Sequence, residues 1–205
     1  MFPFAEKNKM RNCLAISMLI LMFSCSPRRI TTRYYEENQV ALDKIEASYA
    51  SVSRKVPFSI AYTDKNFRNL TLEIDTDTLS YVYQFAAGEK RIADTLKKYK
   101  IDPAPALSIM ESMKKIRCTW INKFDQYIDG KKKPVVFMSV KPVGLSGRFS
   151  SKRYYIITYF NQDQYYDSEG RLVNNRKQWQ LQKLNGEIFH RINSKVCFTV
   201  SSSFR

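Results

Sequence analysis

The chain has 205 residues, which is enough for one domain with a substantial core or at most two small domains. Hydrophobic residues make up 44% of it, as in an ordinary globular protein, and glycine and proline are scarce, at 6 and 7 residues, which argues against long disordered segments. The formal net charge of +15 predicts either anionic partners, namely lipid head groups, acidic glycans or nucleic acid, or simply a soluble lysine-rich surface.

The first 25 residues have the order of an export signal. Basic residues at Lys7, Lys9 and Arg11 precede an apolar or weakly polar run at 13–23, and the small residue Ser24 follows the run. This sequence of a charged, an apolar and a small part is typical of a secretory signal peptide. The run is too short for a transmembrane helix, which needs about 18 or more apolar residues.

The end of this leader, Leu21-Met22-Phe23-Ser24-Cys25, resembles the lipobox of a bacterial lipoprotein signal. Ordinary cleavage favours small residues at both −1 and −3, and Met22 at −3 is large. The resemblance implies that residues 1–24 are removed, that the sulfur of Cys25 receives a diacylglycerol, and that its freed amine receives a third chain. The alternatives are an uncleaved segment, or ordinary secretion with Cys25 as a plain thiol.

The lipoprotein resemblance also implies a location. Ser26 at +2 is not the aspartate that retains such proteins in the inner membrane, which favours the outer membrane, and no acidic cluster follows the anchor, which favours a periplasm-facing domain. Residues 25–33 are interpreted as a lipidated tether whose three arginines lie at the lipid surface. An exported protein is not expected to bind nucleic acid. Met10 is an alternative to Met1 as the true start.

The first half of the globular part combines helices and strands. Apolar residues at spacings of three and four predict a helix over about 34–52. Alternating apolar residues predict strands at 56–63, 70–74 and 79–85, and Asp75–Thr78 between the last two predicts a hairpin turn. Two helices are expected to follow, at about 92–99 and 102–117, the second of them with Asp102 as its N-cap and Pro103 at its first position.

The second half is predicted to be mainly strands. They are expected at 119–128, 134–140, 153–160, 178–184, 187–192 and 196–204, with hairpin turns at Asp129-Gly130 and Asn185-Gly186. The order of one helix, three strands, two helices and an antiparallel meander predicts an α+β fold. Residues 34–205 are interpreted as a single domain, with a split into two subdomains near 86–102 as the alternative. The helix-then-meander order is similar to the cystatin/NTF2-like arrangement, in which a curved sheet cradles a helix.

Two cysteines, Cys118 and Cys197, remain after the leader. Because an exported compartment permits disulfides, we predict a bridge between them, which closes a long loop and stabilises by roughly 4 kcal/mol in the chain-entropy model. The alternative is two separate buried thiols.

No catalytic constellation is found in the sequence. The single histidine, His190, is expected to have a structural role or to be exposed, and no His or Cys ligands stand at the spacing of a zinc site. Neither GxxxxGK[ST] nor GxGxxG is present, so no phosphate-binding loop is indicated. We therefore predict no metal, no cofactor and no enzymatic activity.

Aromatic and basic residues are interleaved in the last third of the chain, and such pairs stack on sugars or hold acidic groups. The candidates for a binding surface are Arg148, Arg153, Tyr155, Tyr159, Arg171 and Trp179.

Three functions are compatible with these observations. The first is a non-enzymatic, lipid-anchored envelope protein whose basic, tyrosine-rich sheet binds a protein or an anionic envelope component. The second is a hydrolase of envelope polymers that uses a pair of acids, for which Glu73, Asp75 and Asp77 are candidates. The third is a lipid-anchored inhibitor or immunity-type protein that caps an enzyme with a basic loop, such as residues 142–152.

Overall fold

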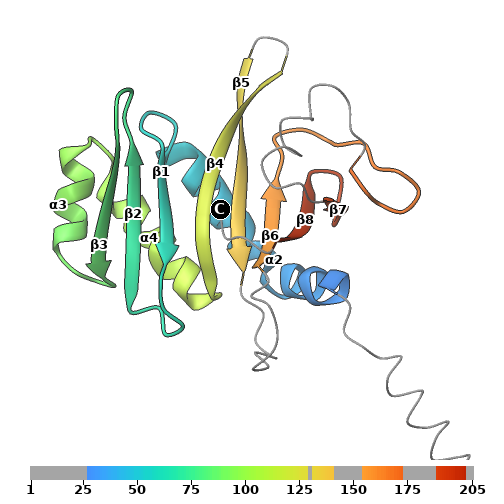
Figure 1. Ribbon diagram of the computed structural model, residues 1–205, viewed down its shortest axis with the longest axis horizontal. Helices are drawn as coiled ribbons and strands as arrows, with labels where there is room; N and C mark the ends of the chain where they lie inside the picture. Colours follow the sequence, from blue (N-terminus) through green and yellow to red (C-terminus); the bar gives the residue numbers. More distant parts are fainter. Residues whose placement is uncertain (1–26, 129–130, 141–153, 173–187, 202–205) are drawn as a thin grey trace, which may run out of the picture.

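The computed structural model describes residues 27–128, 131–140, 154–172 and 188–201 (Figure 1). These residues form one eight-stranded antiparallel sheet in the order β3-β2-β1-β4-β5-β6-β8-β7. Helices α2, α3 and α4 share a core with one face of the sheet. The α+β prediction is therefore confirmed for the described residues, and the predicted strand at 178–184 with its Asn185-Gly186 turn lies outside them.

Helix α2 (Pro27–Val52) begins earlier than the sequence predicts. Its buried residues, which follow the helical period from the first turns on, are Thr31, Tyr35, Leu42, Ile45 and Tyr49. The Thr31 hydroxyl donates a hydrogen bond of 2.9 Å to the carbonyl of Pro27, and proline suits a first helical position because it lacks the N–H that would be unpaired there. The prediction of a tether is therefore wrong for residues 27–33, which form the start of this helix.

The three strands that follow α2 form the first half of the sheet. They are β1 (Phe58–Tyr62), β2 (Asn69–Asp75) and β3 (Ser80–Ala86), each paired antiparallel with the next. Leu72 lies opposite Ile60 on one side and opposite Tyr83 on the other. The predicted hairpin between the last two strands is confirmed.

Helices α3 (Arg91–Lys98) and α4 (Pro103–Lys115) connect the two halves. Asp102 caps α4 as predicted, since its side chain accepts a hydrogen bond from the backbone N–H of Ala104 at 3.1 Å. The buried stripe of α4 comprises Ala106, Ile109, Met110 and Met113. Two tyrosine hydroxyls fix this helix, because Tyr62 donates to the carbonyl of Met110 and Tyr34 to that of Ile116.

The second half contains β4 (Cys118–Ile128), β5 (Lys131–Val140), β6 (Tyr154–Tyr159), β7 (His190–Arg191) and β8 (Val196–Ser201). Strand β4 pairs with β1, so the two halves join at the centre of a continuous sheet. Each half therefore repeats one unit, a helix followed by a three-stranded meander: α2 precedes β1-β2-β3, and α4 precedes β4-β5-β6.

Helix α2 ties the halves together because it does not pack on its own meander alone. It contacts β5, β6 and β8 of the second half as well as α4. The resulting core cluster runs from Tyr35 to Val196. A smaller cluster lies apart from it and includes Trp120, Phe137 and Phe189. Within the described residues, no helix is both long and apolar enough to cross a bilayer.

Candidate functional site

The predicted disulfide is not present: Cys118 and Cys197 are both free, fully buried thiols. They belong to different clusters, Cys118 to the helix-covered core and Cys197 to the smaller cluster. Strands β5 and β6 also separate β4 from β8, which puts the two cysteines roughly 14 Å apart at the usual strand spacing. A disulfide needs Cα atoms within about 7 Å of each other, so the prediction is wrong.

Both thiols are chemically quiet. Burial raises the pKa of Cys118 to about 12, and burial also raises the pKa of Cys197 well above its ordinary value. Since only a thiolate attacks or binds metal efficiently, neither cysteine is a nucleophile in this fold.

The predicted binding surface does not form as the sequence suggests. Tyr159 is only 7% exposed, and Tyr155 is half buried; both pack into the core under the helices. The Tyr159 hydroxyl donates a hydrogen bond of 3.0 Å to Asp43 of α2, and burial together with the Asp43 carboxylate raises its pKa. Their placement on a binding surface was therefore wrong. Three other candidates, Arg148, Arg153 and Trp179, lie outside the described residues.

Arg171 remains accessible, but carboxylates hold it. Its guanidinium donates to Asp167 at 2.8 Å and lies 3.1 Å from Glu169. Asp167 also accepts hydrogen bonds from the backbone N–H groups of Glu169 and Arg171, and the Arg171 side chain and these N–H groups lower its pKa. Arg171 therefore mainly stabilises the turn at 167–171. This turn is closed by the antiparallel bridge between Tyr166 and Leu172.

His190 is placed structurally. Its ring stacks on Phe198 at 5.4 Å between centroids, and the side chain is half buried. Burial, followed by the nearby Arg28 and Arg171, lowers its pKa below the ordinary value of 6.5. Its neutral form is therefore the one that the fold favours.

Substitution of His190 by Phe is expected to reduce the acid sensitivity of the fold. Because the folded-state pKa lies below 6.5, the unfolded chain takes up a proton first as the pH falls, and the free energy of unfolding decreases below about pH 6.5. Phenylalanine keeps the stacking on Phe198 and cannot titrate. Urea unfolding at about pH 7.5 and about pH 5.5 measures the effect, as a smaller loss of stability in the variant; an equal loss in both proteins contradicts it.

Two of the three candidate acids accept hydrogen bonds within the local hairpins. Glu73 accepts a hydrogen bond of 3.1 Å from Ser59, and Asp75 accepts one of 2.5 Å from Ser80. Neither of these carboxylates, nor Asp77, lines the pocket between α2 and α4 or the one between α3 and α4. The arrangement does not bring two of them to one cavity, as a glycosidase requires.

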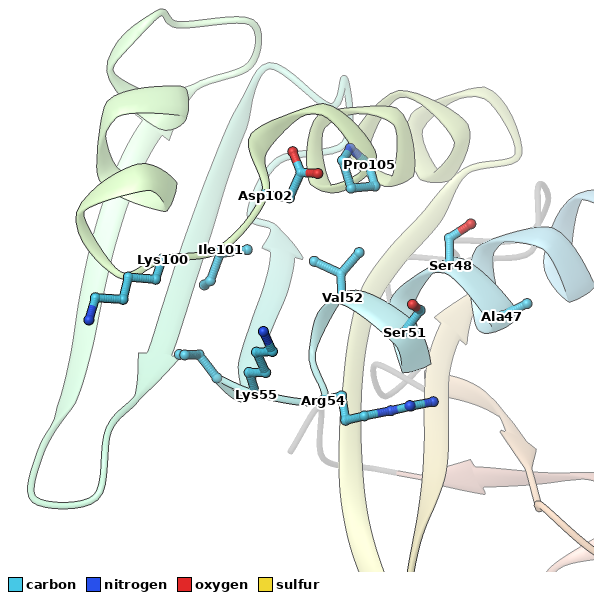
Figure 2. Close-up of a pocket in the computed structure, with 11 residues that line it drawn as sticks. Ala47, Ser48, Ser51, Val52, Arg54, Lys55, Lys100, Ile101, Asp102 and Pro105 are labelled. Carbon is cyan, nitrogen blue, oxygen red and sulfur yellow. The ribbon is translucent and has the colours of Figure 1, made fainter.

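A pocket of about 720 Å³ lies where the end of α2 meets the start of α4 (Figure 2). It is larger than the pocket between α3 and α4, which has a volume of about 550 Å³. Five apolar side chains contribute to its walls: Ala47, Val52, Val56, Ile101 and Pro105. Two serines of α2, Ser48 and Ser51, add hydroxyl groups. The pocket thus combines apolar contact area with polar groups, as ligand sites commonly do.

Three cations surround this pocket. Arg54 and Lys55 come from the turn after α2, and Lys100 comes from the loop before α4, where it adopts a left-handed backbone with φ of 59°. Figure 2 shows the Lys55 side chain rising between Val52 and Ile101. All three cations are exposed, and within the described residues their side chains make no ion pair or hydrogen bond.

The carboxylate in this pocket is that of Asp102, and it is committed to capping α4. The cations therefore outnumber the acid, and the local charge is positive. The first N–H groups of α4 add to this positive charge, because a helix N-terminus carries a partial positive charge. The arrangement suits an anion that also has an apolar or ring face.

Sequence reasoning missed this site because its residues come from segments that are far apart in the chain. Arg54-Lys55 and Lys100 each look like ordinary solvated charge in the sequence. In the part of the chain that the structure describes, no group of three or more His, Cys, Asp or Glu side chains is arranged to hold a metal ion.

Comparison of the chain with known protein families, with curated proteins and with solved structures finds no match.

Proposed function

We propose that this chain is a lipid-anchored cell-envelope protein, a non-enzymatic binding module that holds an anionic envelope component. The anchor is Cys25, and the domain follows it directly, because α2 begins only two residues later at Pro27. Ser26 at +2 supports the outer membrane, with the domain facing the periplasm.

The observation that carries the binding role is the pocket between α2 and α4. Arg54, Lys55 and Lys100 line it beside apolar walls and form no ion pair with another described residue, and its one acid is used as a helix cap. This geometry moves the proposed binding surface away from the tyrosine-rich strands and onto the helical side. The ligand class that fits is a carboxylate- or phosphate-bearing molecule with a sugar ring or another apolar face.

A hydrolase is less well supported by the same pocket. Retaining and inverting glycosidases both need two carboxylates that face one substrate, at separations of about 5 to 9.5 Å. Asp102 is the only acid among the residues that line this pocket. Its carboxylate already accepts a hydrogen bond from the backbone N–H of Ala104.

We also propose the cystatin/NTF2-like likeness as the finer description of the second half. What supports it is the order of α4 followed by the meander β4-β5-β6, together with the packing of α4 against β4. The first half repeats the same order with α2 and β1-β2-β3.

Removal of the three pocket cations tests the binding role. We expect the combined variant Arg54→Gln, Lys55→Gln and Lys100→Gln to weaken binding of an acidic oligosaccharide probe, oligogalacturonate, by about threefold to a hundredfold, since each exposed ion pair contributes about 0.2–1 kcal/mol. Equilibrium titration at fixed ionic strength measures it, with a neutral glucose oligomer as the ligand control.

The matched control removes the same charge at the other end of α4, at the exposed residues Lys65, Lys114 and Lys115, each changed to Gln. Helix α4 has 13 residues, so at about 1.5 Å per residue this end lies roughly 18 Å from the pocket end. The affinity of this control is expected to stay within about twofold of the original, because charges beyond a Debye length of about 8 Å are largely screened. Equal losses in both variants contradict a localised site, and so does an absence of binding to the unmodified chain.

A further inference from the structure

We propose that the end of the domain where α2 begins lies against the surface of an anionic bilayer. The contact side chains are Arg28, Arg29 and Arg191, with Tyr165 and Ile188 entering the headgroup region. This inference rests on the proposed anchor at Cys25 for its orientation, and it adds a second, non-covalent contact with the same membrane.

The first observation is the place where the helix starts. Ser26 alone separates Cys25 from Pro27, and a residue spans at most about 3.6 Å, so an acylated Cys25 holds the first turn of α2 within a few ångströms of the lipid surface. Arg28 and Arg29 are exposed on this turn. A helix that begins here leaves no slack for the domain to stand away from the bilayer.

The second observation is that two later segments meet this turn. The Arg28 guanidinium lies 3.6 Å from the position that a Cβ on Gly170 would take, and the Cβ of Arg191 lies 3.7 Å from it. The backbone N–H of Arg191 donates a hydrogen bond of 2.7 Å to the carbonyl of Gly170. Gly170 has a positive φ of 74°, which suits the turn and keeps the space open for the arginines.

The overall arrangement agrees with this contact. Figure 1 shows the start of α2, the segment around 160–172 and β7 at one end of the molecule, whereas α3 lies at the opposite end. The start of α2, the turn at Gly170 and Arg191 are therefore on the same side. A bilayer that takes up the lipid of Cys25 meets this end first.

The third observation is the charge at this end. Five arginines gather there or on the adjoining turns of α2: Arg28, Arg29, Arg33, Arg171 and Arg191. Ion pairs are seen for two of them, Arg33 with Glu37 and Arg171 with Asp167 and Glu169. Arg191 instead lies over the ring of Tyr166 at 5.7 Å. Within the described residues Arg28 and Arg191 form no ion pair, and these two charges suit the phosphates of anionic lipids.

The fourth observation is apolar exposure beside these cations. Tyr165 is 79% exposed and Ile188 is 55% exposed, and they flank the two segments that meet at Gly170. The backbone N–H of Leu172 donates to the carbonyl of Phe189, so the segment that carries Ile188 is paired with the turn that follows Tyr165. Tyrosine beside arginine is typical of side chains that settle at a membrane interface.

Arginine footprinting of the full-length protein tests the proposal. The chain is purified from envelopes, reconstituted into vesicles of phosphatidylcholine or of phosphatidylcholine with about one third phosphatidylglycerol, and modified with phenylglyoxal. We expect the modification rates of Arg28, Arg29 and Arg191 to fall about fivefold on the anionic vesicles. A basic residue near such a surface gains about 1 kcal/mol, which corresponds to a factor of about five. About 1 M NaCl should restore them, because it shortens the Debye length to about 3 Å.

Internal controls and a variant complete the test. Arg68 and Arg91 are exposed residues of the other half of the sheet and of α3, and their rates should not change. The double variant Arg28→Gln and Arg29→Gln should lose about half or more of the protection of Arg191, whereas Lys97→Gln with Lys98→Gln on α3 should keep it. Equal rates on both vesicle types, or equal protection of Arg68 and Arg91, overturn the proposal.

The intact mass of the same preparation separates this inference from the anchor. If the mass contains no lipid, the proposed function fails, and the footprint still decides the surface at a vesicle concentration high enough to bind an unanchored chain. If the lipid is present and Arg28, Arg29 and Arg191 stay unprotected, the domain hangs from its anchor without touching the bilayer, and only the present inference fails.

Discussion

Replacement of Cys25 by Ser is expected to release the chain from envelope lipid, the largest effect that we predict for a single residue. Each buried methylene contributes about 0.8 kcal/mol to membrane binding; one acyl chain binds marginally, and two bind stably. An S-diacylglycerol with a third chain is therefore a lasting anchor, and the variant that lacks the sulfur has none. Fractionation of producing cells, followed by flotation of the envelope, measures the shift.

The leader supplies a matched control for this substitution. Cys13 lies inside the apolar run at 13–23, which the proposed processing removes, so Cys13→Ser should leave the location unchanged. A Cys25→Ser chain that still floats with envelope lipid at the same processed mass contradicts the anchor. A Cys13→Ser chain that behaves like the Cys25 variant assigns the effect to the apolar run instead.

Leu42→Ala is expected to lower the free energy of unfolding by about 2–5 kcal/mol, the usual range for a leucine removed from a packed core. Leu42 is fully buried in the face of α2 that packs into the main core. Since α2 contacts β5, β6 and β8 as well as α4, a cavity there loosens the packing of α2 on the second half of the sheet. Urea unfolding, followed by far-ultraviolet circular dichroism, gives the change in midpoint.

Val40→Ala on the same helix is the control. Val40 is 85% exposed, and substitutions at such positions usually stay within about 0.5 kcal/mol. Both changes put alanine into one helix, so helix propensity affects them in the same direction. Similar small losses for the two variants contradict the packing of α2 described above, and so does a loss at position 40 that exceeds the loss at position 42.

Local chemistry made part of the fold predictable. Alternation of apolar residues located β1, β2 and β3, because side chains of a strand repeat every two residues. Burial itself does not alternate in all three, since β1 is buried at every residue and β3 is exposed at most of its residues. Asp102 followed by Pro103 located the start of α4, since both residues act within a single helical turn. These signals are read from neighbouring residues, and tertiary packing did not override them.

The start of α2 shows where local signals end. Arginines at 28, 29 and 33 interrupt the hydrophobic pattern, so the first turns look like a charged linker in the sequence. The helix continues there because Thr31 and Tyr35 bury one narrow face while the arginines remain outside. Because the first buried residue, Thr31, is polar, a search for periodic apolar residues does not detect this part of the helix.

The site needed long-range information that a single sequence does not carry. Alternation correctly puts Tyr155 and Tyr159 on the same face of β6, but it does not say which face α2 covers. The number of cysteines permits a bridge, but only the strand order reveals that β5 and β6 keep Cys118 and Cys197 apart. The pocket likewise depends on the way α2 and α4 meet, which makes Lys55 and Lys100 line the same cavity.

The intact mass of the chain isolated from envelopes tests the anchored-domain account most directly. We predict a polypeptide that begins at Cys25 and carries a diacylglycerol with an additional acyl chain, and an N-terminal peptide that holds all of that added mass. A chain that begins at Met1 or Met10, or that begins at residue 25 with an unmodified thiol, would contradict the account.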